Sequence, residues 1–306
     1  MQRASNFHRG LVSPRYWITW LGILVLFLLV YLPYPFLYRL GICIGRFSMF
    51  FMKRRVFIVR RNLELCFPDM DQEYLAQCVK SNFESLGLGL LETGMAWFWS
   101  DRRVKNWFSV KGMEYLREAQ ENGQGILMIG LHFMSLELGG RAMGLCHPMT
   151  AIYRPHNNKL IEWVQTKGRM RSNKAMINRR NLRGIIRSLQ SGDVVWFAPD
   201  QDYGPKGSVF VRFFSVPDVA TTSGTWVLAR LAKPILMTVV FLRKEDRSGY
   251  ELLIKPELKD YPLDNELKAA RYINKIIEYE IMQAPNQYMW LHRRFKTRPK
   301  GNNSFY

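Results

Sequence analysis

The sequence predicts an α/β fold: a mixed, partly parallel sheet flanked by helices and preceded by one N-terminal transmembrane helix. Three observations support this prediction. Residues 18–32 form an almost unbroken apolar run, and residues 125–131 form a shorter apolar run between glycines, typical of a strand buried on both faces. Strand and helix patterns then alternate to the end of the chain. Because no repeat or low-complexity linker interrupts them, we expect one globular domain.

The N-terminal run predicts a membrane anchor. No charged residue stands between Arg15 and Arg39, although Pro33 and Pro35 interrupt the apolar stretch. A helix over residues 16–32 would fall slightly short of a bilayer core of roughly 30 Å, and residues 36–40 could extend it. We therefore expect a short N-terminal segment at 1–15 and a single, kinked transmembrane anchor at 16–38. The segment after the apolar run contains no small-x-small cleavage site, so a cleaved signal peptide is not favoured.

Residues 39–67 are predicted to form a basic interfacial segment. Aromatic and apolar side chains surround the isolated Arg39 and Arg46, and a cluster at residues 53–55 follows. This pattern fits a helix on an anionic membrane surface, and an ordinary core helix with a solvated basic end is the alternative. Basic residues are more numerous after the apolar run than before it, which predicts a single-pass protein with its domain, residues 68–306, in the cytoplasm.

Charge restricts the partners without choosing among them. The 306 residues include 44 Lys and Arg against 25 Asp and Glu, a formal net charge of +19. Such a surface attracts nucleic acid, acidic lipid headgroups or an acidic carrier protein. The four cysteines form no CxxC pair, so neither a zinc site nor a disulfide framework is predicted, and reduced thiols suit a cytoplasmic domain.

The remaining elements follow from apolar spacing. The segment Pro68-Asp69-Met70-Asp71 is a start signal for a long amphipathic helix that we expect to continue to Trp99. After the strand at 125–131, further strands are predicted at 150–153, 194–198, 235–242 and 250–254. Helices are predicted at about 160–170, 181–189, 221–231 and 265–282.

His132 and Glu137 are the first candidates for catalysis. His132 ends the predicted strand, and Glu137 lies in the first turn of the helix that follows. Sites in open α/β sheets gather at the carboxyl ends of strands. On a straight helix a spacing of five would separate the pair by roughly 140°, so the turn must bring His132 back toward Glu137. The carboxylate would then fix the imidazole tautomer and make His132 a general base.

Two further acidic residues, Asp200 and Asp202, follow the strand at 194–198 and are expected at the same edge. They would bind sugar hydroxyls or balance arginines, although a plain turn before Gly204 accounts for them equally well. Ser135 lacks the G-x-S-x-G surroundings of a nucleophile. The histidines form no H-E-x-x-H pattern, and no metal is predicted.

The HFMSLE segment resembles the H-x4-D/E motif of glycerolipid and lipid A acyltransferases. Nearly the whole chain resembles the late acyltransferase family of lipid A biosynthesis, which includes the Kdo-lipid IV(A) lauroyl, palmitoleoyl and myristoyl acyltransferases. The blocks that carry this resemblance are PRYWITWLG, RRNLELCFPDM, ETGMAWFW, YRPHNN, RMRSNKAM, WFAPDQDYGPKGSVF and QYMWLHRRFKTRP.

The resemblance implies a single-span inner-membrane enzyme with a glycerolipid acyltransferase-like domain. Its donor would be an acyl carrier protein thioester, its acceptor a hydroxyacyl chain of an anionic glycolipid, and it would need no cofactor. His132 would deprotonate the acceptor hydroxyl with support from Glu137, and no acyl-enzyme would form. Arg169 matches a family arginine that supports the catalytic acid, and Arg171 is a near neighbour that could replace it.

Other residues are assigned more loosely. Arg154, Arg171, Asp200 and Asp202 are expected to bind substrate. Arg293, Arg294 and Lys296 would meet the carrier protein or the membrane surface, unless the cluster is only a solubilising tail. The blocks HFMSLELGGR and YRPHNN look closer to the palmitoleoyl branch than to the lauroyl branch.

Two rival functions stay open at this stage. An acyltransferase for another glycolipid or a lysophospholipid would share the same motif. A membrane-tethered protein that binds nucleic acid would explain the charge, but no nucleic-acid motif is recognised and no nucleic-acid partner is expected.

Overall fold

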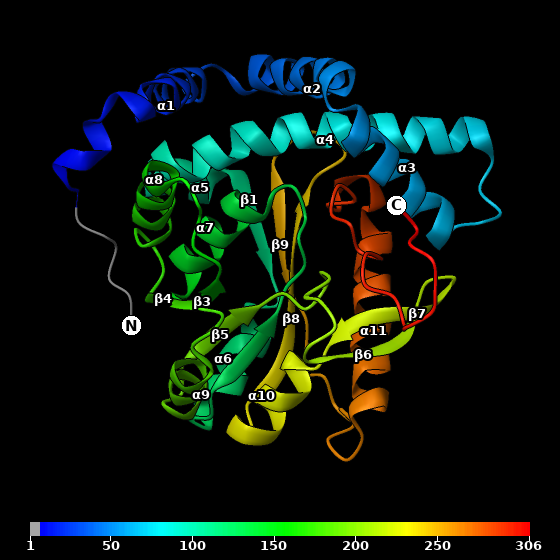
Figure 1. Cartoon of the computed structure of the whole chain (residues 1–306). Coiled ribbons are helices and arrows are strands. Elements are labelled where there is room, and N and C mark those ends of the chain that lie inside the picture. The colour runs from blue at the N-terminus through cyan, green and yellow to red at the C-terminus, as the bar shows by residue number, and fades with distance from the viewer. Residues whose placement is uncertain (1–6) are drawn as a thin grey trace.

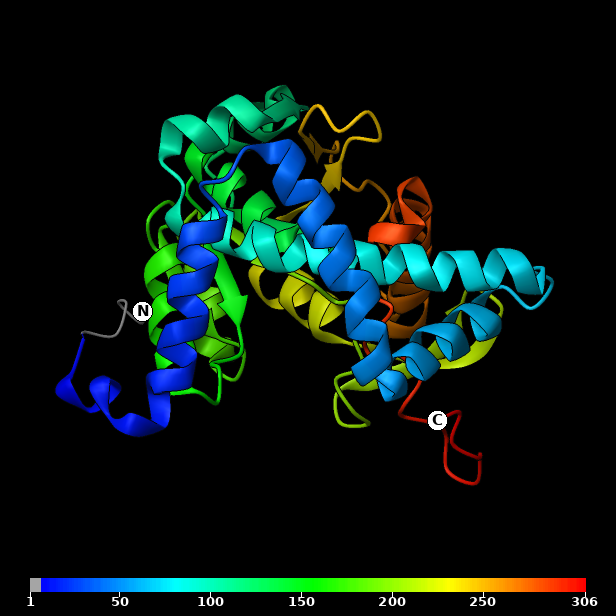
Figure 2. The ribbon, with the colours of Figure 1, turned by 90° about the horizontal axis from the view of Figure 1, so that it is seen from above.

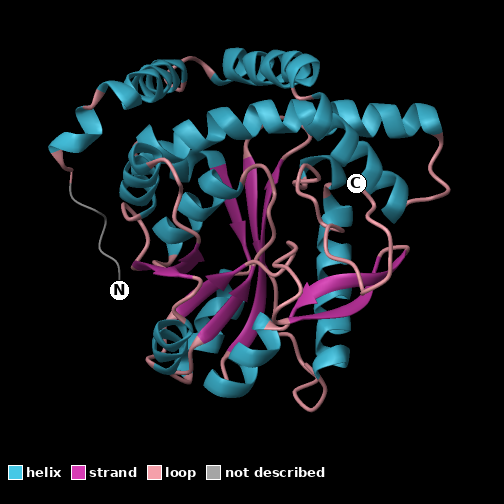
Figure 3. Cartoon of the chain, viewed as in Figure 1, coloured by secondary structure: helices cyan, strands magenta, loops and turns pink. Residues whose placement is uncertain are grey.

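The apolar runs of the sequence lie side by side in a seven-stranded sheet at the centre of the molecule (Figure 3). The computed structural model describes residues 7–306. The strand order is β1-β9-β8-β2-β5-β3-β4, and every neighbouring pair is parallel except β8 and β9. The mixed, partly parallel sheet is therefore present as predicted. The strands are β1 (Phe108–Lys111), β2 (Ile126–Ile129), β3 (Thr150–Tyr153), β4 (Ala175–Asn178), β5 (Val194–Phe197), β8 (Ile235–Arg243) and β9 (Tyr250–Ile254).

Helices cover both faces of this sheet (Figure 1). All four residues of the central strand β2 are buried, as expected for a strand between two helical layers. Ile126 and Met128 pack in the cluster that includes α6 and α7, whereas Leu127 packs in the cluster that includes α9 and α10. These four helices are α6 (Met113–Glu121), α7 (Leu136–Cys146), α9 (Leu182–Gln190) and α10 (Gly224–Ala232).

A long helix, α4 (Gln72–Phe98), crosses one end of the sheet along the top of Figure 1. It is capped by Asp71, the last residue of the predicted start signal, whose carboxylate accepts hydrogen bonds from the backbone N–H groups of Glu73 and Tyr74. The other helices of the domain are α5 (Asp101–Trp107), α8 (Lys159–Arg169), α11 (Glu266–Gln283) and the 3-10 turn η3 (Pro285–Gln287). A hairpin of β6 (Ser208–Phe213) and β7 (Val216–Thr222) packs on α11.

The N-terminal apolar run does not form the predicted transmembrane helix. After the short turns η1 (Arg9–Val12) and η2 (Pro14–Tyr16), α1 (Trp17–Leu29) has 13 residues, a length of about 20 Å. Helix α1 ends before Pro33, and α2 (Tyr34–Phe51) runs in a different direction. Within residues 7–306 no helix is long and apolar enough to cross a bilayer. The predicted anchor at 16–38, and with it the single-pass inner-membrane location, is therefore wrong.

The region after α1 packs on the domain, as Figure 2 shows from above. A Cβ atom on Gly45 of α2 would lie 2.1 Å from the Phe83 carbonyl oxygen of α4, and one on Gly87 of α4 would lie 2.0 Å from the Gly41 carbonyl oxygen. The two helices thus touch through their backbones, which only glycine permits. Helix α3 (Lys53–Cys66) follows and also contacts α4. The predicted division at residues 39–67 and 68–306 stays a prediction.

Candidate active site

His132 and Asp200 meet at the carboxyl edge of the sheet. Strands β2 and β5 are parallel neighbours with Ile129 opposite Phe197, and each candidate follows its strand by three residues. The backbone N–H of His132 donates to Asp200 Oδ2 at 2.9 Å, and the ring nitrogen Nδ1 lies 2.7 Å from Asp200 Oδ1. Because an ionised carboxylate only accepts, Nδ1 carries the proton and Nε2 is left as the basic nitrogen.

Asp200 is ionised although it is completely buried. Burial alone would raise the pKa of this carboxyl, but the charge of the His132 imidazole and the hydrogen bonds from the His132 ring and backbone outweigh it and hold the pKa below its ordinary value. The pair therefore has the form of a carboxylate that orients a histidine and stabilises its protonated form.

Glu137 has a different partner from the one predicted. It lies in the first turn of α7, and Arg169 at the end of α8 donates to both of its oxygens, with Nε at 3.1 Å from Oε2. Gln165 donates to Oε1 at 3.2 Å. Burial would raise the pKa of Glu137, but the charge and hydrogen bonds of Arg169, with those of Gln165 and Trp97, lower it overall. This is a bidentate pair with a permanent cation.

The sequence prediction that Glu137 orients the imidazole is thus corrected: the carboxylate bonded to His132 belongs to Asp200. Arg169 does support the acid of the motif, as the resemblance implied, through the bidentate contact to Glu137. His132 and Glu137 are five residues apart, and the turn after β2 does not bring their side chains into hydrogen-bond contact. Instead it places each side chain against a different neighbouring element, His132 against the end of β5 and Glu137 against α8.

His132, Glu137 and Arg169 line a polar cleft at the carboxyl edge of the sheet, while Asp200 is buried and bonded to His132. The cleft has an empty volume of about 1400 Å³, part of it open to solvent. Three basic side chains at its wall are exposed, and the structure gives their head groups no ion pair among residues 7–306. They are Arg154 after β3, Arg179 after β4, and Lys296 in the C-terminal segment. A wall of this kind suits an anionic ligand.

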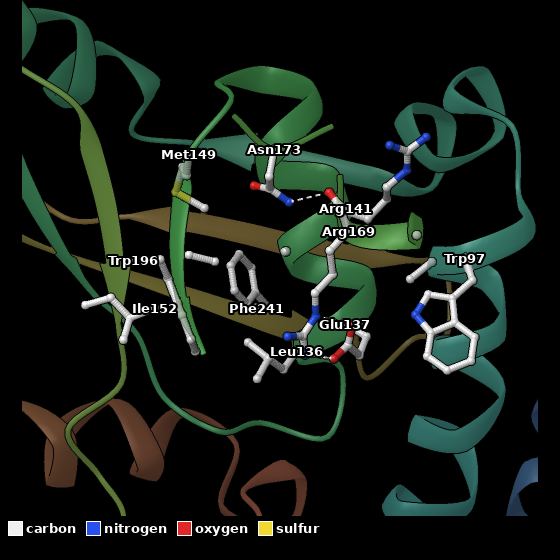
Figure 4. A pocket seen from close by; sticks show the side chains of 14 residues that line it. Trp97, Leu136, Glu137, Arg141, Met149, Ile152, Arg169, Asn173, Trp196 and Phe241 are labelled. Atoms are coloured by element: carbon white, nitrogen blue, oxygen red, sulfur yellow. Dashed lines mark hydrogen bonds and ion pairs between the residues drawn. The ribbon is translucent and has the colours of Figure 1, made fainter. Parts of the chain in front are cut away.

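An apolar chamber adjoins the cleft (Figure 4). Its empty volume is about 570 Å³, within the roughly 300–1,000 Å³ that is common for ligand sites. Trp97 of α4 stands on one side, and Ile152 and Trp196 stand on the opposite side, with the Arg169–Glu137 pair between them. The cleft and the chamber share Leu136, Glu137, Ile152, Arg169 and Trp196.

Two predicted substrate-binding residues have other roles. Arg171 lies outside the lining of the cleft and donates to the carbonyl oxygens of Trp97 and Trp99, at 2.6 and 3.0 Å, so it caps the C-terminal end of α4. Asp202 does line the cleft, but its carboxylate accepts hydrogen bonds from Gly204 and from the backbone and hydroxyl of Thr297. Asp202 therefore fastens the loop after β5 to the C-terminal segment.

The C-terminal basic cluster is also mostly internal. Arg294 is 2% exposed and donates to the Ala220 carbonyl oxygen at 2.6 Å, so the prediction that it meets a carrier protein or a membrane is wrong. Arg293 is half-buried, with its guanidinium over the Tyr306 ring. Only Lys296 of the three is exposed, and it faces the catalytic cleft.

Several residues of the site carry no clear sequence signal. Trp196 makes an edge contact with the His132 ring and separates cleft from chamber. His292 lines the cleft and accepts a hydrogen bond from the Asp202 backbone, and burial, with nearby charges, lowers its pKa to about 4. The quoted block QYMWLHRRF contained His292, but nothing in it indicated a place in the site. Ser135 is fully buried and donates to the Phe241 carbonyl oxygen, which suits a structural hydroxyl.

Comparison with known proteins agrees with this arrangement. Residues 4–297 match the model of the family described as bacterial lipid A biosynthesis acyltransferase. The chain is 60% identical over 301 residues to the lipid A biosynthesis palmitoleoyltransferase of Escherichia coli (strain K12), covering 98% of each chain. It is 53% identical over 306 residues to the lipid A biosynthesis lauroyltransferase of the same organism, covering 100% of each. The crystal structure of the 1-acyl-sn-glycerophosphate (LPA) acyltransferase PlsC from Thermotoga maritima matches at 16% identity with a TM-score of 0.40, covering 87% of this chain and 97% of that one, and is too distant to inform the site.

A histidine oriented by a buried carboxylate, in a basic cleft that an apolar chamber adjoins, defines an enzyme that acts on a ligand with apolar and anionic parts. The chain belongs to the bacterial lipid A biosynthesis acyltransferase family. It is an acyltransferase of lipid A biosynthesis that acts on a glycolipid acceptor.

Proposed function

We propose that this enzyme transfers a fatty acyl group from an acyl carrier protein thioester to a hydroxyacyl chain of Kdo-lipid IV(A). The observation that carries the proposal is the position of His132, which lines a basic cleft that shares part of its wall with an apolar chamber. The cleft suits the phosphates and carboxylates of the acceptor, and Arg154 is its exposed guanidinium after β3. The chamber suits the hydrocarbon of the donor.

The proposed reaction is a direct transfer. His132 Nε2 removes the proton of the acceptor hydroxyl while the hydroxyl oxygen bonds to the thioester carbonyl carbon. The carbon–sulfur bond then breaks, and the departing thiolate takes the proton back from the imidazolium. Asp200 stabilises the imidazolium and keeps the ring oriented. The Glu137–Arg169 pair holds α7 against α8 beside both the cleft and the chamber. No cofactor or metal takes part in these steps.

For the donor we propose palmitoleoyl first and lauroyl next. The relative with 60% identity is named a palmitoleoyltransferase, and the one with 53% identity is named a lauroyltransferase. One methylene changes the free energy of burying the acyl chain by only about 0.8 kcal/mol. A preference for one chain length must therefore come from the shape of the chamber.

We also propose that α1 and α2 contact a lipid surface from which the acceptor is taken. Phe47, Phe50 and Phe51 at the end of α2 are 63%, 71% and 75% exposed, and the basic residues 53–55 follow them. Exposed aromatic side chains beside basic ones are typical of interfacial helices. If Phe50→Ser/Phe51→Ser protein still floats with anionic vesicles as wild type does, this contact is wrong.

Mass spectrometry tests the reaction itself. Purified protein is incubated with Kdo-lipid IV(A) and a mixture of acyl carrier protein thioesters, and His132→Ala is run in parallel. We expect one acyl mass gain with wild type and a loss of about 100-fold to 10,000-fold in rate with the variant. No gain with folded wild type would reject this acceptor or donor, and a gain that persists in His132→Ala would reject the general base.

A further inference from the structure

A strongly basic surface lies outside the catalytic machinery. Residues 163–192 contain eight Lys or Arg and no Asp or Glu. Five of these arginines are exposed, and for four of them the structure gives no ion pair among the residues that it describes. We call these four the α9 basic surface: Arg179 and Arg180 between β4 and α9, and Arg183 and Arg187 on α9.

On α9, the two arginines lie on the side of the helix that faces away from the sheet. Ile185 and Leu189 of α9 are buried against the sheet, so Arg183 and Arg187, one turn apart, point to solvent together. Like charges at this spacing on a helix repel each other. Arg183 and Arg187 line a groove together with Asp193, but this carboxylate is buried and already bonded to Lys174 and Ser188. Among the described residues that line the groove, no other acid offsets the repulsion.

The α9 basic surface is continuous with the catalytic cleft. Arg179 lines the cleft, with its guanidinium 5.6 Å from the Tyr203 ring centroid. From there the surface runs along α9, which lies at the bottom of Figure 1. The apolar helices α1 and α2 lie at the top of that view and nearest the viewer in Figure 2. A partner on α9 would thus reach the cleft from the side away from these helices.

We propose that the α9 basic surface docks the acidic protein that carries the acyl thioester. This inference rests on the proposed function, which requires such a donor. A lipid surface in contact with α1 and α2 would lie on the opposite side of the molecule, so these arginines are placed for a soluble partner. Complementary charge there would steer the carrier so that its thioester enters the cleft past Arg179. The C-terminal cluster offers no comparable surface, because Arg294 is buried.

Charge reversal tests this docking surface. The variant Arg180→Glu/Arg183→Glu/Arg187→Glu leaves every cleft residue in place. The matched control Lys259→Glu/Lys268→Glu/Arg271→Glu reverses three exposed charges near and on α11. Each protein is assayed with acyl carrier protein thioester and with the corresponding acyl-pantetheine thioester, which has no protein. Thermal unfolding verifies that each variant folds.

We expect the α9 variant to raise KM for the carrier-bound donor at least about tenfold, to lose the salt dependence of KM, and to keep the wild-type rate with acyl-pantetheine. The control variant should match wild type with both donors. Equal KM values in the two variants, or an equal loss with both donors, would overturn the proposal. Weaker vesicle binding with an unchanged KM would assign the surface to lipid instead. If folded wild type accepts no carrier-bound donor, the proposed function itself fails.

Discussion

Asp200 is fully buried and Glu137 mostly buried at one active site, and the two carboxylates differ in the cation that each one binds. Both have a pKa held below the ordinary value in spite of burial. Asp200 bonds to an imidazole, which can gain and release a proton, whereas Glu137 bonds to a guanidinium, which stays charged. The comparison separates a pair that can take part in proton transfer from a pair that can only hold elements in place.

The largest expected effect is on turnover in Asp200→Asn. The amide keeps the shape of the side chain and can still accept from Nδ1, but it no longer offers the charge that stabilises the imidazolium. We expect kcat to fall at least about 100-fold with KM within about twofold of wild type. Steady-state kinetics with saturating donor checks this. A similar loss in kcat and KM together would mean that Asp200 mainly shapes the binding site.

The second prediction concerns stability in Glu137→Gln. This change leaves the mostly buried Arg169 guanidinium without its counter-ion, and since breaking a fully buried pair costs about 3–5 kcal/mol, the loss here should lie at the low end of that range. We expect the free energy of unfolding to fall by about 3 kcal/mol. Because the pair lies beside both cleft and chamber, KM should rise as kcat falls. Urea unfolding and kinetics give both quantities.

The matched comparison is Asp200→Asn, whose single amide oxygen retains only one of the two hydrogen bonds from His132, and which should lose about 1–2 kcal/mol of stability. If Asp200→Asn proves the less stable of the two while Glu137→Gln proves the less active, the roles assigned to the two carboxylates are reversed. A Glu137→Gln variant with wild-type stability would show that Arg169 finds another partner.

A third prediction tests the chamber on the Glu137 side. Gly140 of α7 lines the chamber, and a Cβ atom there would meet no atom within 4 Å. Gly140→Ala should fold well, since alanine favours a helix interior by about 1 kcal/mol. Gly140→Leu should fill part of the chamber and shift the preference toward shorter donors by about tenfold or more. Competition between acyl chain lengths measures the shift, and an unchanged preference would place the hydrocarbon elsewhere.

The parts of the fold that sequence predicted well are those where one local signal decides. The run at residues 125–131 became β2, and the periodic pattern after Asp71 became α4 with ends within one residue of those expected. Strand β4 was missed because four residues between polar turns carry no usable period, and β6 and β7 were missed because their burial alternates irregularly. The transmembrane anchor was predicted wrongly because hydropathy alone does not show that the helix ends before Pro33.

The site shows the same limit at the level of side chains. His132 and Asp200 are 68 residues apart, and their pairing depends on the register of β2 with β5, which no single-sequence pattern states. The motif brought Glu137 to attention, but its true partner lies on α8. Arg169 and Arg171 differ by only two residues, yet one bonds to Glu137 and the other caps α4, because the end of α8 lies between them.

The smallest expected effect concerns a second histidine, which lacks a carboxylate partner. Burial and nearby charges lower the pKa of His292 from 6.5 to about 4, so the native protein holds it neutral where the unfolded chain would protonate it. Between pH 6.5 and about 4 the unfolded state therefore binds more protons, and stability falls as the pH falls.

His292→Gln should remove that contribution, because the amide oxygen can accept the hydrogen bond from the Asp202 backbone without titrating. We expect the slope of the unfolding free energy in this window to decrease by up to about 1.4 kcal/mol per pH unit relative to wild type. Urea unfolding at several pH values measures the slope. Identical slopes would mean that His292 is protonated in the native protein, and His132 and His292 would then be alike in charge despite their different partners.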